Sequence, residues 1–374
     1  MPDVNNHRTK RVNGTKIYEL NRSLYGLREA NRLFYELCHT TLAEIGFQRL
    51  PHNLCIYAKH LFTEQEVVVA CYVDDTLIFT NSEQSLRELK EQLSSKLDIT
   101  DMGEARYFLG VAITRDRTAG TISLSQQQSI TDLAAEFLGE HLTPTKTPNT
   151  PNTTLHKHPH DQTPPQPLDS EHITQYKSLV GHLNHIARMT RPDVAETVSQ
   201  LSRYLAAPCQ HHLQAAKQAL RYLHTTREHA LTYHANSTND ITAYADANFA
   251  GDQSTTKSTT GYLIMSGGAA VSWASRLQKS IAQSTTEAEL VATTNCANHA
   301  SYILDLAQDL GSQQTTITLY NDNTACHTIA NDPLERRNTR HIHIRHMKIQ
   351  EYTQDGTAQS SLSGYQVTTC TQTH

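Results

Sequence analysis

Apolar and polar positions along the chain fall into short runs and helical periods, and the first clear run predicts a hairpin. Residues 66–73 are rich in valine and indicate a buried strand, and residues 76–80 indicate a returning strand. Asp74 and Asp75 fill the turn between them, so the hairpin carries two carboxylates at its tip. Leucines then recur at helical spacing over residues 86–97, which predicts a helix directly after the hairpin.

Three helical periods lie between residues 176 and 224, each with apolar residues on one face. The stripe positions are Leu179, Leu183, Ile186 and Ala187, then Val194, Val198, Leu201 and Leu205, then Leu213, Ala216, Leu220 and Leu223. We expect a small helical subdomain with a buried stripe and no site chemistry. The paired His211 and His212 are expected to be solvated.

The last third of the chain predicts a run of strands, a helix and another strand. Strands are expected at residues 241–246, 262–265 and 270–273, and residues 281–282 are expected to close a third strand. A capping box at Ser284 and Glu287 predicts a helix that ends at Gly311. Residues 317–320 form the next strand, with Asp322 at its exit, and a final helix follows. The predicted order is β-β-β-α-β-α.

A proline-rich stretch separates these blocks, because residues 143–168 contain seven prolines and almost no apolar side chains. We therefore expect a mixed α+β or α/β chain with several domains. The expected segments are 1–142, a linker at 143–170, a helical segment at 171–235, a mixed-sheet segment at 236–355 and a polar tail at 356–374.

Composition and charge narrow the class of protein. The formal net charge of −5 excludes a chain that coats nucleic acid indiscriminately, so any nucleic-acid contact must be local. Such a patch is expected at Arg336, Arg337, Arg340, Arg345 and Lys348, where five basic residues stand against two acidic ones in residues 331–350; the alternative is a solvated basic face.

The seven cysteines form no Cys-x-x-Cys pair, which argues against a zinc finger or a disulfide scaffold. The polar start and the short apolar runs predict neither a signal peptide nor a membrane span, and hence an intracellular protein that is not secreted.

The carboxylate hairpin carries a specific motif, Tyr72-Val73-Asp74-Asp75. With its flanking blocks at residues 23–32 and 102–110, and with the blocks at 176–181, 190–193 and 220–223 further on, it resembles the reverse transcriptase of copia-type LTR retrotransposons. By this resemblance, nearly the whole chain is the C-terminal part of a copia-type Pol polyprotein. The resemblance implies a partial reverse-transcriptase palm in 1–142, a helical thumb or connection in 171–235, and a ribonuclease H-like domain in 236–355.

The resemblance also implies a polymerase site at Asp74 and Asp75, which would hold the metals of nucleotidyl transfer. The family places a further aspartate on an apolar strand upstream of residues 23–32. In this chain only Asp3 and Glu19 precede that block, and neither lies in such a strand. We therefore expect an incomplete polymerase site and no independent RNA-directed DNA polymerase activity.

Three further motifs resemble the ribonuclease H domain of the same family: Tyr244-Ala245-Asp246-Ala247, residues 284–290, and Tyr320-Asn321-Asp322-Asn323. The resemblance implies that Asp246, Glu289 and Asp322 are the catalytic residues and the ligands of two Mg²⁺ or Mn²⁺ ions. Glu287 is expected to cap its helix, because two residues on a helix differ by about 200° in direction and cannot both face one site.

The family's fourth carboxylate is replaced in this chain, since His343 stands where the motif has an aspartate. Imidazole supplies no negative charge, so the second metal should bind more weakly, and activity should be reduced, shifted toward Mn²⁺, or lost. An alternative interpretation of His341, His343 and His346 is a zinc cluster.

Two functional interpretations follow. The first is a metal-dependent ribonuclease that cleaves RNA in RNA–DNA hybrids, with a truncated reverse-transcriptase module attached. Its expected partner is an RNA–DNA hybrid or template-primer nucleic acid, and its expected location is cytoplasmic retroelement particles or the nucleus. The second is a catalytically dead retroelement remnant that at most binds nucleic acid. The three carboxylates favour the first interpretation, whereas His343 and the missing upstream strand favour the second.

Overall fold

The computed structural model describes residues 9–12, 15–18, 27, 29–139, 142–149, 155, 168–238, 240–252, 254–324 and 366–368. The chain divides into two compact units, one of residues 1–103 with 309–312 and one of residues 104–308 with 313–374. The mixed α and β composition expected from the sequence is confirmed in both units. None of the described helices combines the length and hydrophobicity that crossing a membrane requires.

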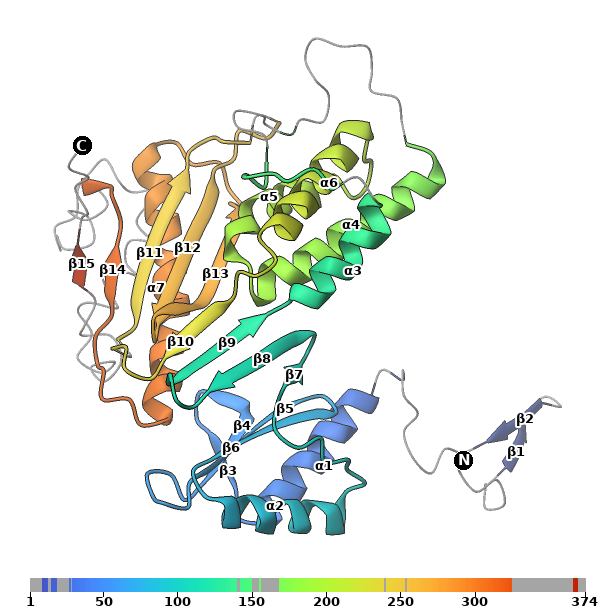
Figure 1. Ribbon diagram of the computed structural model, residues 1–374, viewed down its shortest axis with the longest axis vertical. Helices are drawn as coiled ribbons and strands as arrows, with labels where there is room; N and C mark the ends of the chain where they lie inside the picture. Colours follow the sequence, from blue (N-terminus) through green and yellow to red (C-terminus); the bar gives the residue numbers. More distant parts are fainter. Residues whose placement is uncertain are drawn as a thin grey trace. The chain divides into compact units, whose positions relative to one another are not determined.

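The first unit contains a separate hairpin, a four-stranded antiparallel sheet of order β3-β4-β5-β6, and two helices (Figure 1). Its elements are β1 (Thr9–Val12), β2 (Thr15–Tyr18), α1 (Ala30–Glu44), β3 (Gln48–Leu50), β4 (Asn53–Lys59), β5 (Val67–Tyr72), β6 (Asp75–Thr80) and α2 (Glu83–Lys96). The sequence pattern assigned no element to α1. This helix ends in a Schellman motif, in which Gly46 adopts a φ of +91° and the Phe47 N–H donates to the Leu42 carbonyl at 2.9 Å.

The predicted carboxylate hairpin is confirmed by the pairing of β5 with β6. Tyr72 pairs with Asp75, so the two-residue turn consists of Val73 and Asp74 rather than the predicted Asp74 and Asp75, and Val73 has a φ of +53°. Helix α2 follows as predicted, and the Ser82 hydroxyl caps it by accepting from the Ser85 N–H at 3.2 Å. Residues from both helices and the sheet share one core, made of Leu42, Phe47, Tyr57, Val67, Val69, Leu89 and Leu93.

The second unit begins with an antiparallel sheet of order β10-β9-β8-β7 and a group of helices. The elements are β7 (Tyr107–Phe108), β8 (Val111–Asp116), β9 (Thr121–Ser125), α3 (Gln127–Leu138), α4 (Ser170–Met189), η1 (Pro192–Val194), α5 (Ala195–Ser202), α6 (Gln210–Thr225) and β10 (Leu231–His234). Tyr233 of β10 pairs with Ile122 of β9. The expected segments 1–142 and 171–235 therefore contribute strands to one sheet.

The predicted apolar stripes of the helices are confirmed. Eleven of the twelve stripe positions are buried in one core with residues of α3, and Leu205 is partly buried against it. The expectation that His211 and His212 are solvated was wrong. His212 is fully buried and His211 is half-buried, because His212 turns inward from the start of α6 and stacks on Tyr204.

A second sheet, which we call the mixed sheet, has the order β13-β12-β11-β14-β15. Its elements, with the helix that packs on it, are β11 (Thr242–Asn248), β12 (Thr259–Ser266), β13 (Ala269–Leu277), α7 (Thr285–Asp309), β14 (Thr318–Tyr320) and β15 (Gln366–Thr368). Strand β14 is parallel to both β11 and β15, and the other pairs are antiparallel. The predicted order is confirmed through the strand before Asp322. The strand predicted at 281–282 was wrong, since β13 runs on to Leu277 and α7 begins at Thr285.

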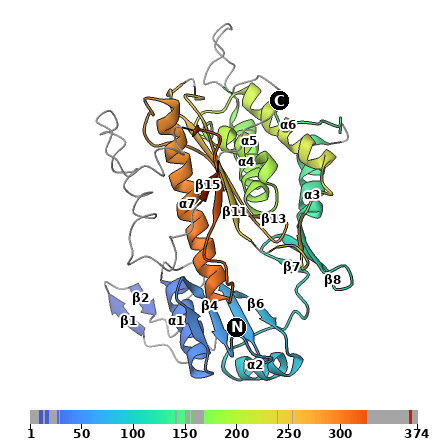
Figure 2. The same cartoon turned by 90° about the vertical axis from the view of Figure 1, so that its left-hand side faces the viewer.

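Helix α7 lies along one face of the mixed sheet, as Figures 1 and 2 show. Ala243 and Ala245 of β11 share a core with Cys296 and Ala300 of α7. The strand alternates, so Tyr244 and Asp246 belong to the opposite face. Helix α5 contacts β13, and the Trp273 indole N–H donates to the Ala187 carbonyl of α4 at 2.7 Å.

Candidate carboxylate metal site

Three carboxylates converge at one end of the mixed sheet, where the inner strands β11 and β14 finish. One oxygen from each of Asp246, Glu289 and Asp322 lies within 4.8 Å of the others. The parallel register of β11 and β14 explains the placement of the two aspartates. Tyr244 pairs with Tyr320, and each aspartate follows its tyrosine by two residues. Glu289 comes from the first turns of α7, which begins next to these strand ends.

Glu289 is the buried member of the group and is held by two donors, whereas both aspartates are exposed. The Ala247 N–H lies 3.3 Å from Glu289 Oε1. The Asn321 side-chain amide donates to Glu289 Oε2 at 3.0 Å and to the Ala245 carbonyl at 3.1 Å. One amide group therefore fixes the glutamate carboxylate to the strand that carries Asp246.

The surroundings of Glu289 make its ionisation costly. Burial and, to a smaller extent, the nearby charges of Asp246 and Asp322 raise the pKa of Glu289 from 4.5 to about 7. The hydrogen bonds from Asn321 and Ala247 act in the opposite direction but do not outweigh these effects. Among the described residues no ion pair joins Asp246, Glu289 or Asp322 to a basic side chain, and the mutual repulsion of three carboxylates at this spacing is what a bound cation would relieve.

Glu287 and Glu289 have separate roles in the structure. The Ser284 hydroxyl accepts from the Glu287 N–H at 3.1 Å, and the Glu287 carboxylate accepts from the Gln283 N–H at 2.7 Å. This is the reciprocal capping that the sequence predicted, except that the N–H donor to Glu287 is Gln283 rather than Ser284. Glu287 is thereby directed to the start of α7, and Glu289 to the carboxylate group.

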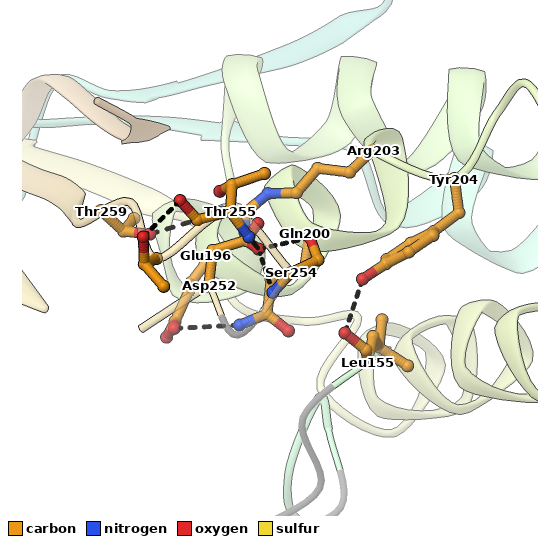
Figure 3. Close-up of polar contacts among 10 residues, drawn as sticks. Leu155, Glu196, Gln200, Arg203, Tyr204, Asp252, Ser254, Thr255 and Thr259 are labelled. Carbon is orange, nitrogen blue, oxygen red and sulfur yellow. Dashed lines mark hydrogen bonds and ion pairs between the residues drawn. The ribbon is translucent and has the colours of Figure 1, made fainter. Parts of the chain in front are cut away.

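The loop between β11 and β12 is anchored to the helices, as Figure 3 shows. The buried Asp252 carboxylate accepts from Arg203 at 2.8 Å, and it also accepts from the hydroxyl and backbone N–H groups of Ser254. Arg203 is the C-cap residue of α5. The pKa of Asp252 is lowered because these hydrogen bonds and the Arg203 charge outweigh the effect of burial. The strand that carries Asp246 is thus followed by a tethered loop.

The other predicted site residues are placed differently. Asp74 and Asp75 are exposed at the hairpin tip, and within the part of the chain that the structure describes, no third histidine, cysteine or acidic residue joins them in a metal-binding group. His343, the alternative zinc ligands His341 and His346, and the basic residues Arg336, Arg337, Arg340, Arg345 and Lys348 lie outside the described residues.

Asn321 is the site residue that sequence reasoning missed. It lies inside the quoted Tyr-Asn-Asp-Asn motif, between Tyr320 and Asp322. Tyr320 pairs with Tyr244, which belongs to the face of the sheet opposite α7. Neighbouring residues of a strand point to opposite faces, so Asn321 points toward α7. A buried amide there needs partners, and Glu289 supplies one of them.

Comparison with known proteins agrees with these motifs. The model of the family "Reverse transcriptase (RNA-dependent DNA polymerase)" matches residues 7–153. The retrovirus-related Pol polyprotein from transposon TNT 1-94 of Nicotiana tabacum is 33% identical over 339 residues, which is 91% of this chain and 25% of that polyprotein. A transposon Ty5-1 protein of Saccharomyces cerevisiae is 34% identical over 276 residues, 74% of this chain and 87% of that protein. A solved RNase H1 from Halobacterium salinarum NRC-1 is 14% identical with a TM-score of 0.26, over 35% of this chain and 85% of that one.

These similarities place the chain in a reverse-transcriptase family of transposon origin. The chain belongs to the copia-type retrotransposon Pol family, and the resemblance stated from its motifs is confirmed. It spans about a quarter of the length of the Pol polyproteins that it matches.

Proposed function

We propose that the mixed sheet and α7 form a ribonuclease H domain that hydrolyses the RNA strand of RNA–DNA hybrids with Mg²⁺ or Mn²⁺. The observation that carries this proposal is the convergence of Asp246, Glu289 and Asp322, whose oxygens lie within 4.8 Å of one another. Carboxylates delivered by two strands and one helix are the donor set that two-metal phosphodiester hydrolysis uses.

The residues fit a hard divalent cation. All three side chains offer oxygen donors, which Mg²⁺ and Mn²⁺ prefer over nitrogen or sulfur. The pKa of Glu289 is raised first by burial and then by the charges of Asp246 and Asp322, and a bound cation would offset both effects. Bound there, two ions would activate a water molecule and stabilise the charge that develops on the phosphate.

The chain's own residues provide orientation. Asn321 and the Ala247 N–H hold the Glu289 carboxylate so that it need not reorganise when a cation arrives. Asp246 and Asp322 are exposed and lie on the side from which a nucleic-acid backbone would approach. Arg336, Arg337, Arg340, Arg345 and Lys348 are proposed to contact phosphates of the hybrid, whose shape rather than base sequence is recognised.

The Asp74–Asp75 hairpin is proposed to lack independent polymerase activity, because in the part of the chain that the structure describes these two carboxylates are joined by no third acidic, histidine or cysteine ligand, and two carboxylates alone should bind metal and nucleotide poorly. The proposed setting is intracellular, in retroelement particles or the nucleus. A second candidate function is a catalytically dead copy that binds nucleic acid, and it is favoured by the histidine at position 343 in place of an aspartate.

The test is cleavage of a labelled RNA–DNA hybrid by the purified chain in Mg²⁺ and in Mn²⁺. Asp322→Asn removes one ligand charge without changing shape and should abolish cleavage. Asp240→Asn is the matched control, because Asp240 is an exposed aspartate just before the other end of β11. Cleavage lost in Asp322→Asn and kept in Asp240→Asn supports the ribonuclease; cleavage unchanged by Asp322→Asn contradicts the site. No cleavage by the folded chain in either metal supports the dead copy.

A further inference from the structure

The start of helix α6 gathers a thiol and two imidazoles from residues close in sequence. Cys209, His211 and His212 each offer a ligand atom, and these atoms lie within 4.8 Å of one another. Cys209 Sγ lies 3.1 Å from His211 Nδ1 and 3.0 Å from His212 Nδ1. The cluster belongs to the helices and shares no residue with the carboxylate site.

The cluster is buried and its orientation is fixed by neighbouring rings. Cys209 and His212 are buried, and His211 is half-buried. The His212 ring stacks on Tyr204 with centroids 3.9 Å apart and an interplanar angle of 17°. The Tyr204 hydroxyl in turn donates to the Leu155 carbonyl, as Figure 3 shows. The imidazole that would bind a metal is therefore positioned before the metal arrives, which lowers the cost of binding.

We propose that Cys209, His211 and His212 form a binding site for one zinc-class transition-metal ion, distinct from the Mg²⁺-type carboxylate site. One thiolate and two imidazoles are borderline-soft donors that favour Zn²⁺ or Co²⁺ and disfavour Mg²⁺. Three protein ligands leave a fourth tetrahedral position for water or another small donor.

The geometry needs only a small adjustment. Zn–S and Zn–N bonds of about 2.3 and 2.0–2.1 Å in a tetrahedron place sulfur and nitrogen about 3.5 Å apart. The sulfur must therefore move by roughly half an ångström from its two nitrogen neighbours. Binding forms one metal–sulfur and two metal–nitrogen bonds, and the Sγ proton is released to solvent. The Cys209 N–H, which donates to His212 Nδ1 at 3.2 Å, loses that acceptor.

The competing explanation is that Cys209 only caps the helix. Its sulfur accepts from the backbone N–H of His212, and the His212 ring accepts from the Cys209 N–H, which is a capping box. Serine performs the capping role at least as well as cysteine, but it is a poor ligand for zinc. Cys209→Ser therefore separates the two explanations without threatening the fold.

The experiment is a titration of the full chain with Co²⁺ in excess Mg²⁺, which occupies the carboxylate site. A thiolate ligand gives a near-ultraviolet sulfur-to-cobalt charge-transfer band that oxygen or imidazole ligands cannot give. Cys55→Ser is the matched control, because Cys55 is an exposed thiol in the other unit. His211→Gln tests a second ligand at the half-buried position.

We expect the band in the wild-type chain and in Cys55→Ser, its loss in Cys209→Ser, and at least a tenfold weaker Co²⁺ affinity in His211→Gln. Added Zn²⁺ should displace Co²⁺ and abolish the band. Absence of the band in the folded wild-type chain, its persistence in Cys209→Ser, or an affinity unchanged by His211→Gln would each overturn the proposal.

Discussion

The side-chain amide of Asn321 donates to Glu289 Oε2 at 3.0 Å and thereby connects α7 to the end of strand β14 in the mixed sheet. The second hydrogen of the same amide is given to the Ala245 carbonyl of β11. Asn321 is only 2% exposed, so neither acceptor has solvent to replace it. This residue is a positioning residue for the carboxylate site, since it acts through Glu289.

Asn321→Ala should weaken Mn²⁺ binding and hybrid cleavage by about 10–100-fold, the range typical of lost support for a metal ligand. The physical reason is that Glu289 loses the shorter of its two hydrogen bonds and keeps only the Ala247 N–H at 3.3 Å. Isothermal titration with Mn²⁺ measures the affinity. Gln314→Ala is the control, because the Gln314 side-chain amide makes a similar pair of hydrogen bonds at the opposite end of β11. It accepts from the Ile241 N–H and donates to the Ile241 carbonyl. Equal losses of Mn²⁺ affinity in the two variants would contradict the positioning role.

Glu289→Gln should stabilise the metal-free chain at pH 8 by about 1–3 kcal/mol. The folded pKa of about 7 lies above the ordinary value of 4.5, so between these values the folded state keeps a proton that the unfolded state has lost. Stability without metal therefore falls as pH rises from about 4.5 to 7 and stays low above it. Denaturant unfolding with and without Mg²⁺ measures this. A variant less stable than wild type at pH 8 without metal would be evidence against the charge cluster.

His343→Asp should raise the Mg²⁺-dependent rate of hybrid cleavage and reduce any preference for Mn²⁺. The reason is that an aspartate restores the negative charge that the family motif places there. The rate ratio in the two metals, measured before and after the substitution, is the readout. His346→Asp adds the same charge three residues on and serves as control. An equal gain from both variants would show that position 343 has no special place in the site.

Arg191 and Asp193 form a second tightly held charge pair, in the helical part of the same unit. The guanidinium donates to both carboxylate oxygens at 2.9 and 2.6 Å and to the Thr226 carbonyl at 3.0 Å. Arg191 is 2% exposed. Burial of Asp193 opposes ionisation, but the hydrogen bonds and charge of Arg191 outweigh it and lower the Asp193 pKa.

Arg191→Met should cost about 2–4 kcal/mol of stability at neutral pH, because it leaves the partly buried Asp193 charge without its partner. The lowered pKa means that the contribution of the pair is present above the ordinary aspartate value and disappears as pH falls through the folded value. Urea unfolding at pH 7 and at acid pH measures both effects. The double variant with Asp193→Asn should lose less than Arg191→Met alone, and a larger loss would refute this assignment.

Local patterns were sufficient for elements whose partners lie nearby in sequence. The β5–β6 hairpin and the stripes of α4, α5 and α6 follow from alternation and helical periodicity, which report burial directly. The pairing of β9 with β10 was not predicted, because more than 100 residues separate these short strands and no local pattern encodes which distant edge a strand joins.

The site was predictable to the extent that its residues lie in motifs. Asp246, Glu289 and Asp322 were named from sequence, but their convergence depends on the parallel register of β11 and β14, which becomes visible only in the fold. Asn321 and the Cys209 cluster were missed for different reasons. Asn321 is a neutral residue beside a charged one. The Cys209 cluster contains a single cysteine, whereas the usual sequence signal of a zinc site is a Cys-x-x-Cys pair.

Trp273 is the chain's single tryptophan, and its indole N–H is bonded to the backbone of α4. The protein therefore contains its own optical reporter at the seam between the mixed sheet and the helices. Separation of the two layers would expose the indole to water and shift its emission to longer wavelength. For each variant in the second unit, the emission wavelength of Trp273 therefore distinguishes a loss of activity caused by altered chemistry from one caused by separation of the helices from the mixed sheet.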